Sequence, residues 1–357
     1  MNQYPFELEA YTRLAKLLQG EDRYEEAIDT LRQGLVIDPE AGDIYNGLGL
    51  LYSALGRHKE AIRVHQKYLQ LAPIEPNAHD SLGLSYQAAG LYHQAIEEYT
   101  RALALDPDFE VAVIHLGNTY FQLGRYRDAI SEFNRYIEIG PSEVEKTRGL
   151  DSIAHVYWKK GELDLAEQTL GKIRLKHRII TPILVAADRG DKVRTEALKT
   201  QFYQAAPSDR GSRLNSRVFY FPMAYVLMKN GRIEEAIEIH KKASSSPPPI
   251  WNHEAYEDCL ANAYLESGRI DDAISEYQRI LLLNSNYPLA HYHLAQAYEA
   301  KGRNDLAHAE YEKFLQVWKD ADRDLPQIKT ALRRISQLSI SDLTEHDFKT
   351  FTDDGHL

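Results

Sequence analysis

One alanine recurs along the chain at a fixed interval. Ala27, Ala61, Ala95 and Ala129 stand 34 residues apart, and each is followed by isoleucine. Later copies of the same position fall at Ala166, Ala236, Ala273 and Ala307. A fixed period of about 20 to about 50 residues is typical of proteins built from stacked supersecondary units. We therefore expect the 357 residues to form a quasi-one-dimensional array in which each unit packs on its neighbours.

Each unit carries a second small residue, which predicts a pair of closely packed helices. Twelve positions before the recurrent alanine the residue is always alanine or glycine, at Ala15, Gly49, Gly83, Gly117, Ala154, Ala224, Ala261 and Ala295. Two antiparallel helices approach closely only where their side chains are small. A tyrosine often follows three residues later, at Tyr52, Tyr86, Tyr120, Tyr157, Tyr264 and Tyr298. These large rings are expected to fill the space between neighbouring hairpins.

Glycine and proline mark the ends of the expected helices. Glycine precedes the recurrent alanine by five residues at Gly56, Gly90, Gly124, Gly161, Gly231, Gly268 and Gly302. Glycine can take the left-handed conformation that ends a helix and turns the chain. Proline follows the alanine by twelve residues at Pro39, Pro73, Pro107 and Pro141, where it closes the second helix.

This register resembles the tetratricopeptide repeat, and eight copies of it cover most of residues 8 to 321. The resemblance implies an all-α fold, a right-handed α-solenoid (superhelix) of antiparallel helical hairpins. It also implies an inner, concave groove faced by repeat positions 2, 5, 9, 12 and 13, where the recurrent alanine is position 20. A groove of this kind holds proteins or peptides and needs no cofactor.

The period slips in places, and the slips predict the domain organisation. Ala166 and Ala236 lie 70 residues apart, so a degenerate hairpin or a hinge is expected between them, with a long connecting helix as the alternative. Pro326 opens an expected capping helix whose Ile328, Leu332 and Ile335 face inward. The expected segments are a lead-in at 1–7, repeats one to five at 8–180, the degenerate repeat or hinge at 181–216, repeats six to eight at 217–321, the capping helix at 325–338 and a flexible acidic tail at 339–357.

Composition excludes several classes of function. The chain has 42 lysines and arginines against 53 aspartates and glutamates, a formal net charge of -11, which gives a phosphate backbone or an anionic membrane no electrostatic reason to approach. A single cysteine, Cys259, allows no internal disulfide and favours a cytoplasmic location. We expect no signal peptide, no transmembrane segment and no metal site.

The candidate binding residues come from the groove-facing positions of the expected repeats. Repeats four and five combine two aromatic side chains, expected to be exposed, with amide and charged groups, which suits an extended peptide. This proposed peptide site consists of Ile114, Asn118, Phe121, Gln122, Arg148, Asp151, His155, Trp158 and Lys159. A second, more apolar groove patch consists of Phe221, Tyr225, Met228 and Lys229. The alternatives are that Phe121 and Trp158 pack on a neighbouring repeat and that the second patch receives the degenerate hairpin.

The favoured function is a non-catalytic interaction scaffold that binds a peptide or protein segment in the concave groove. One alternative is a regulatory or sensing module of a larger bacterial signalling or transcription-regulating assembly, because residues 311–322 resemble the last repeat of such arrays. A third interpretation takes Asp151, His155 and Trp158 as a catalytic cluster, although we predict no enzyme. Self-association through the inner face or through Phe348 and Phe351 is a further prediction.

Overall fold

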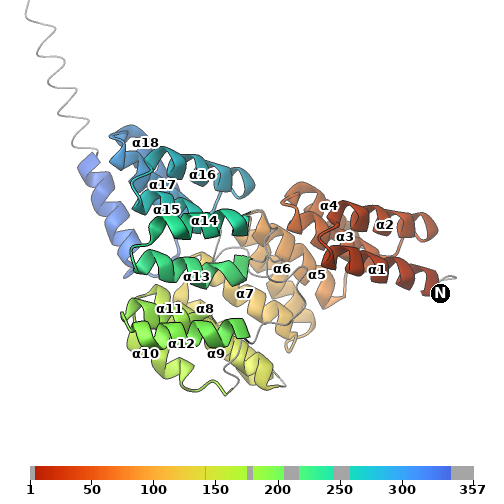
Figure 1. The fold of residues 1–357 in the computed structure, drawn as a ribbon. Coiled ribbons are helices and arrows are strands. Elements are labelled where there is room, and N and C mark those ends of the chain that lie inside the picture. Colours follow the sequence, from red (N-terminus) through yellow and green to blue (C-terminus); the bar gives the residue numbers. More distant parts are fainter. Residues whose placement is uncertain (1–4, 141, 175–179, 205–216, 245–257, 339–357) are drawn as a thin grey trace, which may run out of the picture.

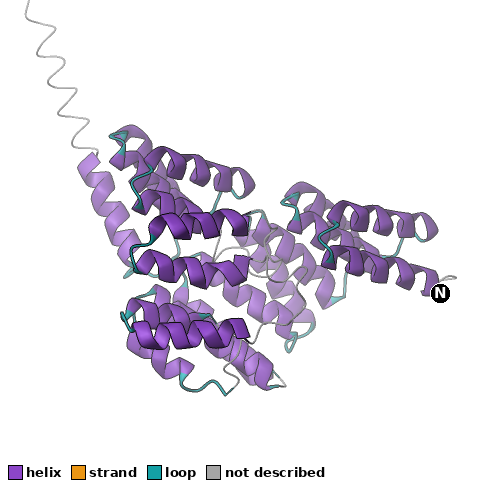
Figure 2. Cartoon of the chain, viewed as in Figure 1, coloured by secondary structure: helices purple, strands orange, loops and turns teal. Residues whose placement is uncertain are grey.

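The computed structural model describes residues 5–140, 142–174, 180–204, 217–244 and 258–338, and these ranges contain helices but no strands (Figure 2). The first ten helices are α1 (Pro5–Gly20), α2 (Tyr24–Ile37), α3 (Gly42–Ala54), α4 (His58–Leu71), α5 (Pro76–Ala88), α6 (Tyr92–Leu105), α7 (Glu110–Gln122), α8 (Tyr126–Ile139), α9 (Glu143–Lys159) and α10 (Leu163–Leu170). The next eight are α11 (Thr181–Asp188), α12 (Lys192–Gln204), α13 (Arg217–Lys229), α14 (Ile233–Ser244), α15 (Cys259–Glu266), α16 (Ile270–Leu283), α17 (Pro288–Ala300) and α18 (Asn304–Val317). A further helix covers 326–338. The predicted all-α solenoid of antiparallel hairpins is confirmed (Figure 1).

The small residues act as the repeat pattern predicts. A Cβ atom added to Gly83 would lie 2.7 Å from the ring of Tyr99, and one added to Gly117 would lie 2.6 Å from the ring of Phe133. Both rings come from the second helix of the same hairpin and are fully or almost fully buried. The missing side chain on one helix therefore makes room for the aromatic ring on the other.

Helices α11 and α12 occupy the interval where the repeat signal is weakest. Gly190, with φ +71°, turns the chain between them, and the two helices pack against each other. Leu184 of α11 is fully buried in a cluster that also includes Ala154 of α9 and Val226 of α13. The described part of the expected segment 181–216 thus stacks between the fifth and the next recognisable hairpin, and residues 205–216 lie outside the described residues.

The C-terminal helix at 326–338 covers the end of the array. Ile328, Ala331 and Leu338 belong to the apolar cluster of the last repeats, and Ile335 packs against it. The prediction that Leu332 faces inward is wrong, since its side chain is 54% exposed. The buried stripe follows a spacing of three and four residues that passes through Ala331 instead. The expected tail at 339–357 lies outside the described residues, and α1 begins at Pro5, inside the expected lead-in.

The array curves until its last two repeats contact its third and fourth, which no periodicity predicted. One continuous apolar cluster includes side chains of α6 to α8 and of α14 to α18. Asn284 donates its Nδ2 hydrogen to the Tyr92 hydroxyl at 3.1 Å, and Asn286 donates to the Gly90 carbonyl at 3.1 Å. Trp318 donates its Nε1 hydrogen to the Gln122 carbonyl at 2.9 Å. We call this set of contacts the closure interface.

The closure interface fits closely around two of the hairpin turns. A Cβ atom added to Gly90 would lie 2.0 Å from Oδ1 of Asn284, and one added to Gly124 would lie 3.0 Å from the Trp318 ring. The backbone N–H of Asp322 donates to the Gly124 carbonyl at 3.0 Å. At the equivalent Gly302, by contrast, no atom of the described residues lies within 4 Å of an added Cβ atom. Glycine at 90 and 124 therefore permits a close approach between parts of the chain that are distant in sequence.

Candidate functional site

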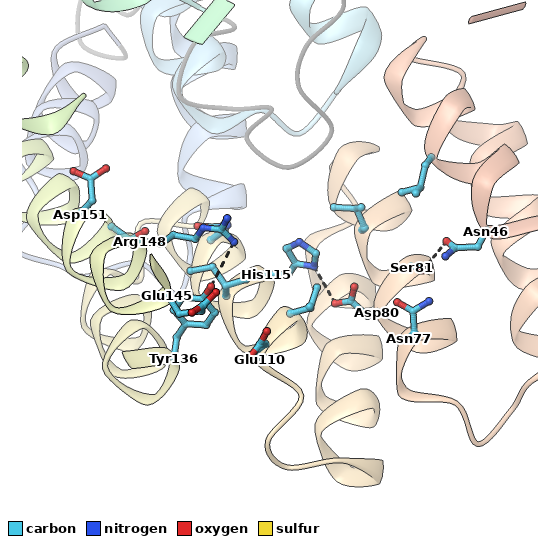
Figure 3. A pocket seen from close by; sticks show the side chains of 16 residues that line it. Asn46, Asn77, Asp80, Ser81, Glu110, His115, Tyr136, Glu145, Arg148 and Asp151 are labelled. Carbon is cyan, nitrogen blue, oxygen red and sulfur yellow. Dashed lines mark hydrogen bonds and ion pairs between the residues drawn. The ribbon is translucent and has the colours of Figure 1, made fainter. Parts of the chain in front are cut away.

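A cavity of about 630 Å³ lies along the inner face of α3, α5, α7 and α9, and we call it the trough (Figure 3). Its lining side chains come mainly from groove-facing positions of repeats two to five. They are Asn46, Leu50, Asn77, Asp80, Ser81, Leu84, Glu110, Val111, Ile114, His115, Asn118, Tyr136, Glu145, Arg148, Asp151 and Ser152. The stacking of first helices from successive hairpins thus produces a wall that carries both apolar and polar groups.

Apolar side chains and amides alternate along the trough. Leu50, Leu84 and Ile114 line it from three successive first helices. Asn46 is already engaged, because its Oδ1 accepts a hydrogen bond from the Ser81 hydroxyl at 2.9 Å. The Asn118 amide, in contrast, makes no side-chain hydrogen bond to any of the described residues. An amide of this kind can both donate to and accept from a peptide backbone.

The charged groups of the trough are mostly acidic. The trough is lined by four carboxylates and one guanidinium, which together carry a formal charge of -3. The carboxylates belong to Asp80, Glu110, Glu145 and Asp151, and the guanidinium belongs to Arg148. Asp80 is paired below the surface, where its Oδ1 lies 2.9 Å from Nδ1 of His115.

The remaining charges differ in how far they are compensated. Glu145 forms a capping box with Ser142 at the start of α9, and the Arg148 charge helps to lower the pKa of this carboxyl after the Ser142 hydrogen bond. Glu110 and Asp151 form no ion pair with any of the described residues.

Asp151 lies at the α9 end of the trough in a position that disfavours its charge. Its Oδ1 atom is buried and has no hydrogen-bond partner among the described residues. Burial raises the pKa of this carboxyl to about 6, and a hydrogen bond from Thr181 offsets part of the rise. An incoming hydrogen-bond donor would satisfy this atom, and an incoming cation would also favour the ionised form.

His155, one turn further along α9, is held neutral. Burial lowers its pKa to about 3, and the nearby Lys159 ammonium lowers it further in the same direction. Its Nδ1 lies 3.4 Å from the Thr181 hydroxyl of α11, and its ring packs edge-on against Phe121. The half-buried Phe121 also packs against Tyr126, with ring centroids 5.4 Å apart. His155 and Phe121, both predicted site residues, therefore contact neighbouring helices and do not line the trough.

The prediction that Trp158 is exposed in the groove is wrong. Its side chain is only 8% exposed, and its Nε1 donates to Oδ2 of Asp188 at 2.7 Å. The expected groove-facing position is occupied, because α11 packs on α9 and brings this carboxylate with it. Lys159 places its Nζ 4.9 Å from the centroid of the Trp158 ring, and the Oε1 atom of Gln122 is buried without a partner among the described residues.

The second predicted patch meets the first through Asp188. Tyr225 donates its hydroxyl hydrogen to Oδ1 of Asp188 at 2.7 Å, and Nζ of Lys229 lies 2.8 Å from the same oxygen. The rings of Trp158 and Tyr225 pack in a T shape, with centroids 5.5 Å apart. Phe221 is buried and Met228 is half-buried. These contacts tie α9, α11 and α13 together, so the patch holds neighbouring hairpins in place.

Four of the nine predicted peptide-site residues line the trough: Ile114, Asn118, Arg148 and Asp151. The sequence pattern did not select repeats two and three, which also line the trough: Asn46 and Leu50 come from repeat two, and Asn77, Asp80 and Ser81 come from repeat three. The repeat pattern could have predicted Asp80, because it occupies the same groove-facing repeat position in repeat three that Ile114 occupies in repeat four. A smaller cavity of about 400 Å³ continues from the trough toward α1, and Asn46 and Leu50 border both.

Among the described helices, none combines the length and the apolar character needed to cross a bilayer. Comparison of the sequence with protein families gives three matches. Two models described as tetratricopeptide repeat match residues 86–146 and 42–75, and one described as TPR repeat matches residues 21–56 and 261–313. No curated protein matches the sequence significantly.

Solved structures with a similar backbone include three helical-repeat chains. The crystal structure of MamA is 26% identical, with 44% of this chain and 91% of that chain covered and a TM-score of 0.37. The APC/C hetero-tetramer Cut9–Hcn1 is 16% identical, with 94% and 57% covered and a TM-score of 0.48. Pseudomonas aeruginosa pilF is 18% identical, with 61% and 96% covered and a TM-score of 0.43.

Proposed function

Because the chain belongs to the tetratricopeptide repeat family, whose repeats in general form non-catalytic scaffolds for protein interactions, we propose that it binds an extended segment of a partner protein in the trough. The observation that carries the proposal is the trough itself, a cavity of about 630 Å³ that runs across four successive first helices. An extended peptide presents a backbone amide and a carbonyl at every residue, and a wall with amides beside apolar side chains can bind both backbone and side chains.

We propose fewer contact residues than the sequence pattern predicts. Ile114 and Asn118 of α7, with Arg148 and Asp151 of α9, line the trough. Arg148 is exposed, Asn118 and Asp151 are half-buried, and Ile114 is buried in the wall. Phe121, His155 and Trp158 instead pack on neighbouring helices. We assign those three a supporting role, in which they fix the relative positions of α7, α9 and α11.

Selection from a phage-displayed library of random peptides of about twelve residues tests the proposal directly. The full chain is immobilised, and enriched peptides are then measured against the variants Asn118→Ala in the trough and Asn134→Ala on the exposed face of α8. Loss of one amide that hydrogen-bonds the ligand should weaken binding about fivefold to about tenfold. Asn134→Ala should leave the affinity unchanged, because this side chain does not line the trough.

Two outcomes would contradict trough binding. The first is that no peptide is enriched on the immobilised chain. The second is that enriched peptides bind both asparagine variants equally well. The alternative role as a regulatory module was based on residues 311–322, but Trp318 and Asp322 from this segment form hydrogen bonds with the fourth repeat. These contacts give the segment a part in the fold, and the regulatory role stays a prediction.

A further inference from the structure

We propose that the partner segment is basic, and that lysine or arginine side chains of this segment pair with Glu110 of α7 and with Asp151 of α9, which line different parts of the trough (Figure 3). The inference rests on the proposed function, since it names the chemistry of the segment that the trough binds. Three observations carry it: the imbalance of charge along the trough, the unpartnered carboxylate oxygen of Asp151, and the apolar side chains that line the trough with Glu110.

The charge imbalance is local and is not removed by neighbouring residues. Asp80 is hydrogen-bonded to His115, and Glu145 is held by its cap and by the Arg148 charge. Glu110 and Asp151 have no ion pair among the described residues. A negatively charged segment would meet like charges at both positions, whereas a cationic side chain would meet opposite charges. The trough therefore discriminates between partners by charge.

The buried Oδ1 atom of Asp151 favours a ligand that donates a hydrogen bond to it. A carboxylate oxygen that is removed from water and lacks a donor raises the free energy of the unbound protein. An ammonium or guanidinium group supplies both the missing hydrogen bond and the opposite charge. Among the described residues, Thr181 gives the Asp151 carboxyl a hydrogen bond, but the Oδ1 atom has no hydrogen-bond partner.

The apolar side chains explain why a long cationic side chain fits better than a free cation. Val111 and Ile114 lie on α7 next to Glu110, and Leu84 lies on the facing α5. Lysine and arginine carry aliphatic stems that pack on apolar surface while the charged end reaches a polar group. One side chain can thus use both features of the wall.

Fluorescence anisotropy with three labelled probes tests the inference on the full chain. The probes are end-capped peptides of equal length that alternate leucine with lysine, glutamate or glutamine. We expect the lysine probe to bind best, and its affinity to fall as sodium chloride rises from about 50 to about 300 mM, because screening weakens exposed ion pairs.

A matched pair of double variants locates the effect. Glu110→Gln with Asp151→Asn removes two negative charges from the trough, and Glu97→Gln with Glu138→Gln removes two from exposed faces of α6 and α8. The trough variant should bind the lysine probe about tenfold more weakly or worse, while the surface variant should bind like the parent. Glu110→Gln alone, at a half-exposed position, provides a second measurement if the double variant loses its helical circular dichroism signal.

The results separate this inference from the proposed function. Preference for the glutamate or glutamine probe, with binding still lost in Asn118→Ala, would overturn the basic partner and support peptide binding in the trough. Equal loss of affinity in the trough and surface variants would also overturn it, because the charge effect would then be general. If no probe binds and the library yields no peptide sensitive to Asn118→Ala, both proposals are wrong.

Discussion

The closure interface makes a quantitative prediction about two glycines at the same repeat position. Gly90 and Gly302 have φ values of +74° and +73°, so alanine at either position meets the same backbone strain. At Gly90 the new methyl group would collide with Oδ1 of Asn284, which lies 2.0 Å from its position, whereas at Gly302 it would meet no atom of the described residues within 4 Å. Gly302→Ala is therefore the matched control for Gly90→Ala.

The size of the difference follows from the contacts that the methyl group displaces. Strain from a left-handed alanine costs about 1 kcal/mol at each position. At Gly90 the displaced Asn284 also loses its hydrogen bond to Tyr92, and the bond from Asn286 to the Gly90 carbonyl is disturbed. Each such bond contributes about 1 kcal/mol. We expect Gly90→Ala to destabilise the protein by about 3 kcal/mol and Gly302→Ala by about 1 kcal/mol.

Urea unfolding followed by circular dichroism measures the two free energies. Because repeat arrays can unfold in stages, amide hydrogen exchange should accompany it. The amide of Asp322, which donates to the Gly124 carbonyl, and that of Asn286, which donates to Oδ1 of Asn284, should exchange faster in Gly90→Ala than in Gly302→Ala. Equal destabilisation and equal exchange in the two variants would refute the argument that Gly90 serves the closure interface.

Three further predictions concern buried polar groups. Asp188→Ala leaves the buried donors of Trp158 and Tyr225 without their acceptor and should lower the free energy of unfolding by about 3 kcal/mol, measured in urea; an unchanged midpoint would contradict this. Burial lowers the pKa of His65 and His240 to about 4 and that of His155 to about 3. Below pH about 6.5 the unfolded chain therefore binds more protons than the folded chain, and the thermal unfolding midpoint should fall as the pH is lowered from 7 to 5. A midpoint that stays constant over this range would contradict the prediction. The pKa of Asp151 is raised from 3.8 to about 6, so this group does not destabilise the fold below pH 3.8 and destabilises it fully above pH about 6. Asp151→Asn should therefore raise the free energy of unfolding by up to about 3 kcal/mol at pH 8 and leave it unchanged at pH 3.5. A gain in stability that does not depend on pH would refute this reasoning.

The repeat fold could be predicted because its determinants are local. The pairing of Gly83 with Tyr99 needs only two residues of one hairpin, and the hairpins follow one another at a fixed period. The contact between Gly90 and Asn286 joins residues 196 positions apart, and it depends on small rotations summed over many hairpins. The repeat period does not specify the rotation between successive hairpins, so the closure interface could not be predicted from the sequence.

The candidate site was predictable in part for a related reason. Position within a repeat determines which way Ile114 and Asn118 point, and the structure places both in the trough. Trp158 also occupies a groove-facing position, but its neighbour α11 departs from the repeat pattern and brings Asp188 against it. The fate of a groove residue thus depends on the next hairpin as well as on its own. Where that hairpin is irregular, the sequence pattern gives no reliable prediction.

Helix α7 links the closure interface to the trough. Its first turns carry Val111 and Ile114, and its last residue, Gln122, accepts the hydrogen bond from Trp318. A wall fixed before binding loses less conformational freedom when a ligand arrives, and so binds more tightly.

Trp318→Phe tests this coupling, because it removes the Nε1 donor and keeps an aromatic ring against Tyr126. The lysine–leucine probe should bind the variant about twofold to about fivefold more weakly, although the substituted residue does not line the trough. Hydrogen exchange of the Asp322 amide reports whether the interface has loosened. Faster exchange at Asp322 with unchanged probe affinity would show that the trough keeps its shape without the closure contacts.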